Sequence, residues 1–169
     1  MPHTIEPAAS ARAACRGCGQ RIAKGELRFG ERMPNPFAEG EMTHWFHLAC
    51  AAYKRPESLL EVLGPDAEDL ERRARRTLEH RRLRRVDGAE HAPTGKALCR
   101  SCRQPIERDA WRVRLVFYED GRFNPGGFIH LDCREAYFET RDILDRLLHF
   151  SPKLSAEDRA ELERYCSKP

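Results

Sequence analysis

Residues 15–18 read CRGC and residues 44–50 read HWFHLAC, and these two stretches decide what the first third of the chain can be. The two cysteines of the first stretch are followed, after twenty-eight intervening residues, by a histidine and a cysteine in the second. Three thiolates and one imidazole form a closed tetrahedral set suited to zinc, with no position left for water. The predicted ligands of this structural zinc ion are Cys15, Cys18, His47 and Cys50.

The same pattern occurs a second time. Residues 99–102 read CRSC and are followed, after twenty-seven residues, by HLDC at 130–133. A second copy in register argues strongly against chance and predicts a second structural Zn²⁺ ion. Its predicted ligands are Cys99, Cys102, His130 and Cys133.

His44 is a competing ligand in the first copy because it lies three residues before His47. The second copy has Gly127 at the place of His44 but keeps His130, which favours His47. The remaining histidines, His91 among them, have no neighbouring ligand in the sequence and are interpreted as surface or packing residues. Cys166 belongs to neither set and is predicted to be a free thiol.

Length and charge limit the class of protein. The chain has 169 residues, and each repeat is small enough that a metal is commonly needed to supplement the core. Seven cysteines and the absence of a signal-like start favour an intracellular, soluble protein in the cytoplasm or nucleoid of a bacterium or the nucleus of a eukaryote. No stretch is long enough to span a membrane. Two zinc sites with six thiolates would lower the formal charge of +3 by roughly 2, so any DNA binding depends on where the charge lies.

The expected architecture is a pair of small α+β zinc-stabilised modules joined by a charged helix and followed by a short C-terminal helix. Ser155 and Asp158 predict the start of that last helix. Asp66 and Gly88 are the expected limits of the joining helix, which is either a solvated connector or a phosphate-contacting element. The expected segments are a flexible arm at 1–10, finger 1 at 11–63, an arginine-rich helical linker at 64–95, finger 2 at 96–150 and the C-terminal helix at 151–169.

Each repeat should also contain a strand, because apolar and basic residues alternate in ELRFGERM at 26–33 and in WRVRLVFY at 111–118. We expect one face of each strand to pack on its finger and an arginine face to turn outward. A helical pattern follows each HxxC pair, at about 49–63 and 132–149.

The long gap between the ligand pairs, the RAAC at 12–15, the IAKGELR at 22–28 and the HWFHLAC at 44–50 together resemble the DNA-nick-sensing zinc finger of poly(ADP-ribose) polymerases, also found in a DNA ligase. The resemblance covers about residues 10–55 closely and about 94–135 more weakly. It therefore implies a tandem pair of such fingers.

In that family, arginines on the finger clamp the DNA backbone and an apolar loop residue stacks on a base pair exposed at the break. The resemblance implies backbone contacts from Arg12 and Arg28, and from Lys96 and Arg112 in the second repeat. Neighbouring arginines on the two strands, Arg32 and Arg114, extend this expected DNA-binding set. Counting back from His47 places the stacking position on Ala38, one residue after Phe37, and a one-residue shift of the loop makes Phe37 the candidate. Phe37 folded back onto its own finger is the competing interpretation, and Phe123 is the only apolar candidate in the second loop.

We find no Gly-rich phosphate loop, no nucleophile elbow and no placed carboxylate pair, so the sequence predicts no enzyme and no small-molecule substrate. The leading hypothesis is a non-catalytic protein that binds nicked, gapped or ended DNA, with any repair enzyme on a separate chain. The alternatives are a zinc-stabilised protein-interaction adaptor and a duplex-specific transcriptional regulator. A continuous basic stripe favours DNA binding, whereas arginines individually paired to acids favour the adaptor.

Overall fold

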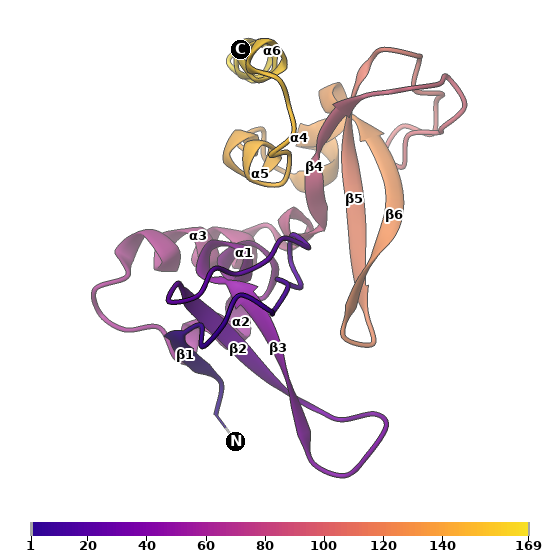
Figure 1. Cartoon of the computed structure of the whole chain (residues 1–169). Coiled ribbons are helices and arrows are strands. Elements are labelled where there is room, and N and C mark those ends of the chain that lie inside the picture. The colour runs from indigo at the N-terminus through magenta and orange to yellow at the C-terminus, as the bar shows by residue number, and fades with distance from the viewer. Residues whose placement is uncertain (1, 169) are drawn as a thin grey trace. The chain divides into compact units, whose positions relative to one another are not determined.

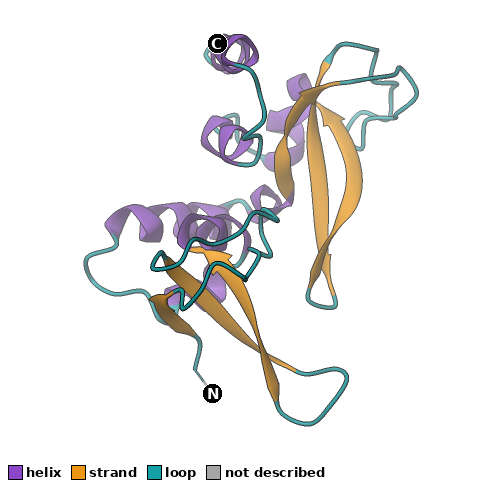
Figure 2. Cartoon of the chain, viewed as in Figure 1, coloured by secondary structure: helices purple, strands orange, loops and turns teal. Residues whose placement is uncertain are grey.

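The computed structural model describes residues 2–168 and divides into two compact units. Unit 1 comprises the chain up to Arg84 together with Asp120–Phe123, and unit 2 comprises Arg85–Glu119 and the chain from Asn124 onward. Each unit is a small α+β module with a three-stranded sheet and several short helices (Figures 1 and 2). The expected fold class is therefore confirmed.

The sheet of unit 1 has the order β1-β2-β3, and both pairings are antiparallel. Its elements are β1 (Thr4–Pro7), β2 (Leu27–Pro34) and β3 (Glu41–His47), followed by α1 (Leu48–Lys54) and α2 (Pro56–Leu60). The core contains Ile22, Phe29, Phe46 and Leu59, all 1% exposed or less. The predicted helix at 49–63 is two short helices, because Pro56 begins the second and cannot continue the hydrogen bonding of the first.

The expectation of a flexible arm at 1–10 is wrong for residues 4–7, which form strand β1 on the edge of the sheet. Ile5 lies opposite the buried Phe29, and Glu6 lies opposite Arg28. The strand continues into the module through Ala8, whose N–H donates to the Glu26 carbonyl at 2.8 Å. Pairing with β2 stabilises a segment whose own composition shows no strong strand pattern.

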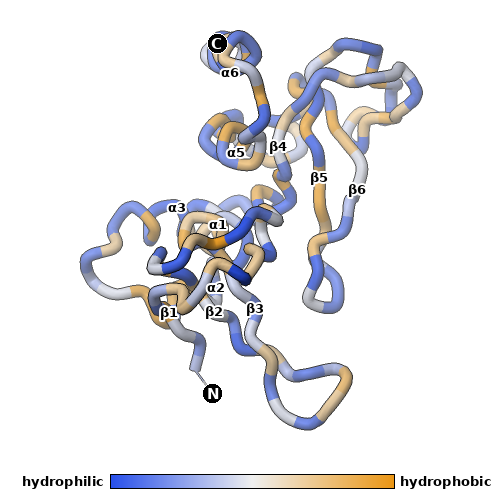
Figure 3. The backbone as a smooth tube through the Cα atoms, viewed as in Figure 1, coloured by the Kyte–Doolittle hydropathy of each residue, from blue (hydrophilic) through white to orange (hydrophobic). Residues whose placement is uncertain are grey.

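The expectation of a connecting helix over 66–88 is also corrected. Helix α3 spans Glu68–Glu79 and packs on α1 and α2 inside unit 1. Although most of its surface is hydrophilic (blue in Figure 3), Ala74 and Thr77 are fully buried. The Thr77 hydroxyl donates to the Ala52 carbonyl at 3.0 Å. This narrow contact face makes α3 part of the first module.

Beyond α3 the chain forms a 3-10 turn, η1 (Arg81–Arg85), and then β4 (Val86–His91), where we expected more helix and linker. Strand β4 pairs antiparallel with β5 and is one of the two edge strands of the second sheet. Gly88 has φ +114° at an irregularity in this pairing, a conformation that an L-residue with a side chain rarely adopts. The helix expected to end at Gly88 therefore ends at Glu79, and Gly88 serves the strand.

Unit 2 has the strand order β4-β5-β6, and hydrophobic stretches of β5 are orange in Figure 3. Its further elements are β5 (Trp111–Glu119), β6 (Arg122–His130), η2 (Leu131–Cys133), α4 (Arg134–Phe138), α5 (Leu144–His149) and α6 (Ala156–Cys166). The helical pattern predicted over 132–149 is interrupted at Glu139, whose φ of +63° ends α4. The predicted start of α6 is confirmed, because the Ser155 hydroxyl accepts the Asp158 N–H at 3.0 Å.

Among the described residues, no helix has both the length and the apolar character needed to cross a membrane.

Candidate metal centres and nucleic-acid interface

The four predicted ligands of the first site converge on one point. The loop before β2 supplies the first two cysteines, the end of β3 supplies His47, and the first turn of α1 supplies Cys50. His47 Nδ1 lies 3.4 Å from Cys18 Sγ and 3.8 Å from Cys50 Sγ. Ligands of a tetrahedral zinc ion are separated by about 3.3–3.8 Å, given metal–ligand bonds of about 2.0–2.3 Å. The spacing thus fits zinc without rearrangement.

Backbone donors prepare the sulfurs of this site to carry negative charge. The N–H groups of Gly17 and His47 each lie 3.3 Å from Cys15 Sγ. Hydrogen bonds from the Cys18 and Cys50 thiols, together with backbone hydrogen bonds from His47 and Cys18, lower the pKa of Cys15 to about 3. The same interactions with Cys15 and Cys18 raise the pKa of Cys50, so the three thiols cannot all ionise without a cation among them. A bound metal cation is therefore needed for all three cysteines to be present as thiolates.

The second site repeats this arrangement. His130 Nδ1 lies 3.4 Å from Cys102 Sγ and 3.7 Å from Cys133 Sγ, and the His130 N–H donates to Cys99 Sγ at 3.3 Å. His130 Nε2 lies 3.1 Å from the Pro105 carbonyl, which can only accept, so the proton is on Nε2 and Nδ1 is left for the metal. Both tetrads predicted from the sequence are confirmed as sites for two structural zinc ions. His44 is buried in β3 and belongs to neither tetrad.

The prediction of outward-facing arginines is wrong for Arg28 and Arg112. Arg28 is 8% exposed; its guanidinium lies 3.5 Å from the centre of the Trp45 ring, and its Nη2 lies 3.3 Å from a Glu6 oxygen. Arg112 repeats this with different partners: it is 6% exposed, stacks 3.5 Å above the Phe128 ring and donates to Glu90 at 2.8 Å. The aromatic ring and the carboxylate on the neighbouring strands cover the long side chain.

The acidic partners of Arg28 and Arg112 are residues that the sequence analysis missed. Glu6 and Glu90 lie at matching positions when the first cysteines of the two repeats are aligned, and each lies opposite the matching arginine in the sheet. That alignment is the available signal. The correspondence between the two glutamates was overlooked because Glu6 was assigned to a flexible arm and Glu90 to a linker.

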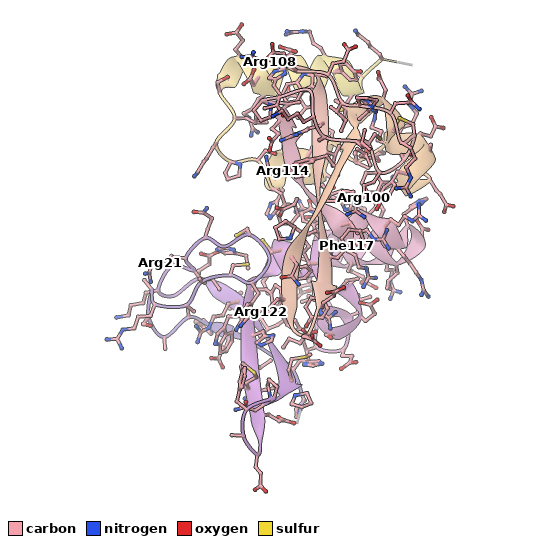
Figure 4. The ribbon with its side chains drawn as sticks, turned by 90° about the vertical axis from the view of Figure 1, so that its right-hand side faces the viewer. Arg21, Arg100, Arg108, Arg114, Phe117 and Arg122 are labelled. Carbon is pink, nitrogen blue, oxygen red and sulfur yellow. The ribbon has the colours of Figure 1, made fainter. Side chains whose placement is uncertain are left out.

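Arg114 (labelled in Figure 4) is held inside unit 2 by three acceptors. Its guanidinium donates to Glu90 at 2.9 Å and to the backbone carbonyls of Asp87 and Phe150 at 2.9 and 3.1 Å. These bonds tie β5 to β4 and to the end of α5, so the geometry gives Arg114 a structural role. Arg32 is half-buried on β2, and its backbone N–H donates to His3 at 3.0 Å.

Phe37 lies at the turn of the β2–β3 hairpin and is 86% exposed. The turn is ordered by its own hydrogen bonds: the Phe37 N–H donates to the Asn35 side chain at 2.9 Å, and the Asn35 N–H donates to the Gly40 carbonyl at 3.0 Å. An aromatic ring is thus displayed on a defined loop rather than folded back onto its own finger. Phe123, the corresponding candidate of the second repeat, is half-buried and lies in the segment that unit 1 includes.

The remaining predicted contacts lie in exposed loops near the tetrads. Arg12 and Lys96 are both exposed. Sequence reasoning missed Arg16 and Arg100, which occupy the second position of the two CxxC stretches and are also exposed (Arg100 is labelled in Figure 4). Their backbone N–H groups donate to the Trp45 and Phe128 carbonyls at 2.9 Å, which fixes both loops against the strand before each zinc-binding histidine. The sequence signal that could have identified them is the arginine that occurs in both CxxC stretches.

The chain is similar to known proteins. Residues 6–79 match the model described as "Poly(ADP-ribose) polymerase and DNA-Ligase Zn-finger region". The chain is 29% identical over 160 residues to the poly(ADP-ribose) polymerase of Sarcophaga peregrina, with 79% of this chain and 16% of that protein covered. It is 29% identical over 200 residues to poly(ADP-ribose) polymerase 1 of Gallus gallus, with 96% of this chain and 19% of that protein covered. A shorter match, 40% identical over 50 residues, is to poly(ADP-ribose) polymerase 1 of Caenorhabditis elegans. It covers 30% of this chain and 5% of that protein.

The chain spans less than a fifth of the length of these relatives. The matched model covers the end of β1, the first tetrad and α3, all of which lie in unit 1. The second tetrad has the same ligands, the same order of elements and the same Glu–Arg–aromatic arrangement. The chain thus contains a zinc-finger module, at residues 6–79, that matches the poly(ADP-ribose) polymerase and DNA-ligase finger family, and the second tetrad repeats its ligand set in unit 2.

Proposed function

We propose that this chain recognises DNA strand breaks or ends, through backbone contacts and base stacking, and does so without catalysing a reaction. The observation that carries the proposal is the 86% exposure of Phe37 on an ordered hairpin turn. An intact duplex offers no open face to such a ring, whereas a nick, gap or end exposes a base pair on which it can stack. Stacking of this kind recognises the structure of the break and not its sequence.

Exposed cations near the tetrads supply the electrostatic part of the proposal. Arg12, Arg16 and Lys24 lie on the loops before β2, and none of them forms an ion pair with another described residue. In unit 2, Lys96 and Arg100 occupy comparable loops. Contacts from such side chains to phosphates carry affinity without sequence information. A nick also lowers the cost of bending DNA onto a finger.

The closed zinc sites support a non-catalytic role. Each tetrad supplies four protein ligands, so a bound zinc ion keeps no open position for water or substrate and acts by holding the module together. In this proposal the chain contributes break recognition to DNA repair, and a separate enzyme performs the chemistry.

The deciding experiment compares binding of the zinc-loaded chain to a nicked dumbbell DNA and to the same dumbbell sealed, each at several salt concentrations. We expect tighter binding to the nicked form and a log–log salt slope of about −0.9 for each phosphate contact on either DNA. Equal, salt-sensitive binding would replace break recognition by general duplex binding.

One observation favours the adaptor as a second candidate. Arg55 pairs with Glu31 and Arg84 with Glu57. Three arginines of α3, Arg72, Arg73 and Arg75, pair with acids on the same helix. Charges neutralised in this way are typical of a protein-interaction surface rather than a continuous phosphate-binding stripe. Absence of binding to both dumbbells would favour this function over DNA recognition.

A further inference from the structure

Unit 2 contains a third cluster of ligand-type side chains outside the two tetrads. His91 at the end of β4 faces Asp158 and Glu161 on α6. One ligand atom from each of the three residues lies within 4.8 Å of the others. Asp158 and Glu161 are three positions apart and therefore project from one face of the helix. The geometry points to a third divalent-metal site, of His–Asp–Glu type, that joins α6 to the sheet.

The imidazole of His91 is oriented as a metal ligand. Its Nδ1 lies 2.9 Å from the Asp109 carbonyl. A carbonyl can only accept, so Nδ1 carries the proton of that hydrogen bond. In the neutral ring, Nε2 then turns a lone pair toward two carboxylates, which is unfavourable unless a cation lies between them. A backbone carbonyl that fixes the tautomer of a histidine is a common outer partner of metal ligands.

The distances fit a shared metal better than a direct ion pair. His91 Nε2 lies 3.4 Å from Asp158 Oδ1 and 4.0 Å from Glu161 Oε1. Hydrogen bonds between a charged nitrogen and a carboxylate are shorter, at about 2.7–2.9 Å. The two zinc tetrads of the same chain show nitrogen–sulfur ligand separations of 3.4–3.8 Å. Nitrogen and oxygen ligands bonded to zinc at about 2.0–2.2 Å lie about 3.3–3.6 Å apart. The separation between His91 and Asp158 fits this range, and Glu161 would have to move inward.

The surroundings hold the three side chains in place. The Trp111 indole N–H donates to Glu161 Oε1 at 2.9 Å, and the Trp111 ring lies against the His91 ring with centroids 3.9 Å apart. At the other end of α6, the Tyr165 hydroxyl donates to Asp132. The helix is thus fixed against unit 2 at both ends, and the His91 side of the contact is partly ordered before any ion binds.

The chemistry of the donors indicates the class of ion. One imidazole and two carboxylates suit zinc and the neighbouring divalent transition metals, with water completing the coordination. The side chains of His91, Asp158 and Glu161 are 33%, 35% and 45% exposed, so solvent and ion can reach the cluster. With three protein ligands and partial exposure, we expect weaker binding than at the closed tetrads.

The test counts zinc bound to the chain after equilibration against a series of buffered free-zinc concentrations. The wild-type chain should rise from two zinc ions to three. The double variant Asp158→Asn, Glu161→Gln should stay at two, because amides are poor zinc ligands, while the amide oxygen introduced at position 161 can still accept the Trp111 N–H. Glu157→Gln, an exposed position in the same turn of α6, is the matched control and should still bind three.

Cobalt(II) provides a second measurement. The third equivalent should add ligand-field absorption without extra thiolate-to-cobalt charge transfer, since the proposed site contains no sulfur. A wild-type chain that stops at two zinc ions, or a double variant that still takes up a third, would overturn the proposal. Added thiolate charge transfer would also overturn it by placing the third ion on a cysteine such as Cys166. Circular dichroism and retention of two tightly bound zinc ions show that each variant is folded.

Discussion

In the proposed function, discrimination between broken and intact DNA rests on Phe37, because its ring is exposed and the turn that carries it is ordered. Replacing Phe37 by alanine should reduce affinity for the nicked dumbbell by the energy of one stacking contact, about 1–3 kcal/mol. Affinity for the sealed dumbbell should change little, since an intact duplex has no open base pair. Fluorescence anisotropy on both DNAs, measured side by side, checks this.

Leu98→Ala is the matched control for Phe37→Ala, since Leu98 is also apolar and is 60% exposed but lies beside the second tetrad. Its removal should leave the preference for the nick unchanged. If Phe37→Ala weakens both DNAs equally, the ring contributes to general binding and has no role in recognising the break.

Arg28 is buried and paired with Glu6, so the phosphate contact that the family resemblance implies for it requires its guanidinium to turn from Glu6 to the DNA backbone. Replacing Arg28 by alanine tests that contact. Arg28→Ala should weaken binding to both dumbbells and reduce the steepness of the salt dependence by about 0.9, as expected for one lost phosphate contact. The variant should also be less stable by about 0.5–2 kcal/mol, because it loses the stacking on Trp45. Bound zinc should remain unchanged, since Arg28 is not a ligand. Loss of zinc in this variant would mean that its binding defect reflects misfolding.

If Arg28 contacts the DNA backbone, Glu6 competes with the phosphate for it, because both acceptors bind the same guanidinium donors. Glu6→Gln should therefore strengthen DNA binding by up to about 1 kcal/mol at low salt. The gain should vanish when Arg28→Ala is already present, a coupling that a double-mutant cycle measures. An equal gain in both backgrounds would show only a general effect of the lost negative charge.

At the level of single residues, the sequence predicted those side chains whose roles depend on spacing. The eight zinc ligands follow from the repeated CxxC and HxxC stretches, and their convergence is confirmed. The burial of Arg28 and Arg112 could not be predicted from alternation alone. It depends on Trp45 and Phe128 and on acids from strands that the sequence did not reveal.

Among the elements, α3 is the one whose arginines appeared most suited to phosphates in the sequence. In the structure Arg72 and Arg73 pair with Asp69, and Arg75 pairs with Glu71 at 2.8 Å. We expect Arg75→Gln to leave the salt slope of DNA binding unchanged, because its charge is already balanced within the helix. A decrease of about 0.9 in the steepness of that slope would instead reveal a phosphate contact from α3.

The predicted elements differ from the observed ones where tertiary contacts override local pattern. Strands β2 and β5 were predicted because their alternation is strong, and α6 because Ser155 caps it. Strands β1, β3, β4 and β6 were missed, since each is an edge strand stabilised mainly by its neighbour. The helical residues of α3 were predicted as helix but assigned to a linker, because Ala74 and Thr77 give only a narrow apolar face.

At the scale of the whole molecule, two compact units each contain one closed tetrad. Binding of zinc to structural sites of this kind contributes about 10–16 kcal/mol, more than the stability that a module this small gains from its core. Each unit should therefore depend on its own ion. Excess chelator should unfold both units, which far-ultraviolet circular dichroism would detect.

The two tryptophans allow the zinc dependence of folding to be measured separately for each unit, because Trp45 lies in unit 1 and Trp111 in unit 2. Cys50→Ser should leave one tightly bound zinc ion and unfold unit 1, while Cys133→Ser should do the same to unit 2. In a Trp111→Phe background, the fluorescence of Trp45 reports the unfolding of unit 1. In a Trp45→Phe background, the fluorescence of Trp111 reports the unfolding of unit 2. Phenylalanine is a reasonable replacement for Trp45, since the matching position of the second module is Phe128. If Cys50→Ser abolished the folded signal of Trp111 as well, the two modules would fold as one cooperative unit, and zinc at the first site would control both.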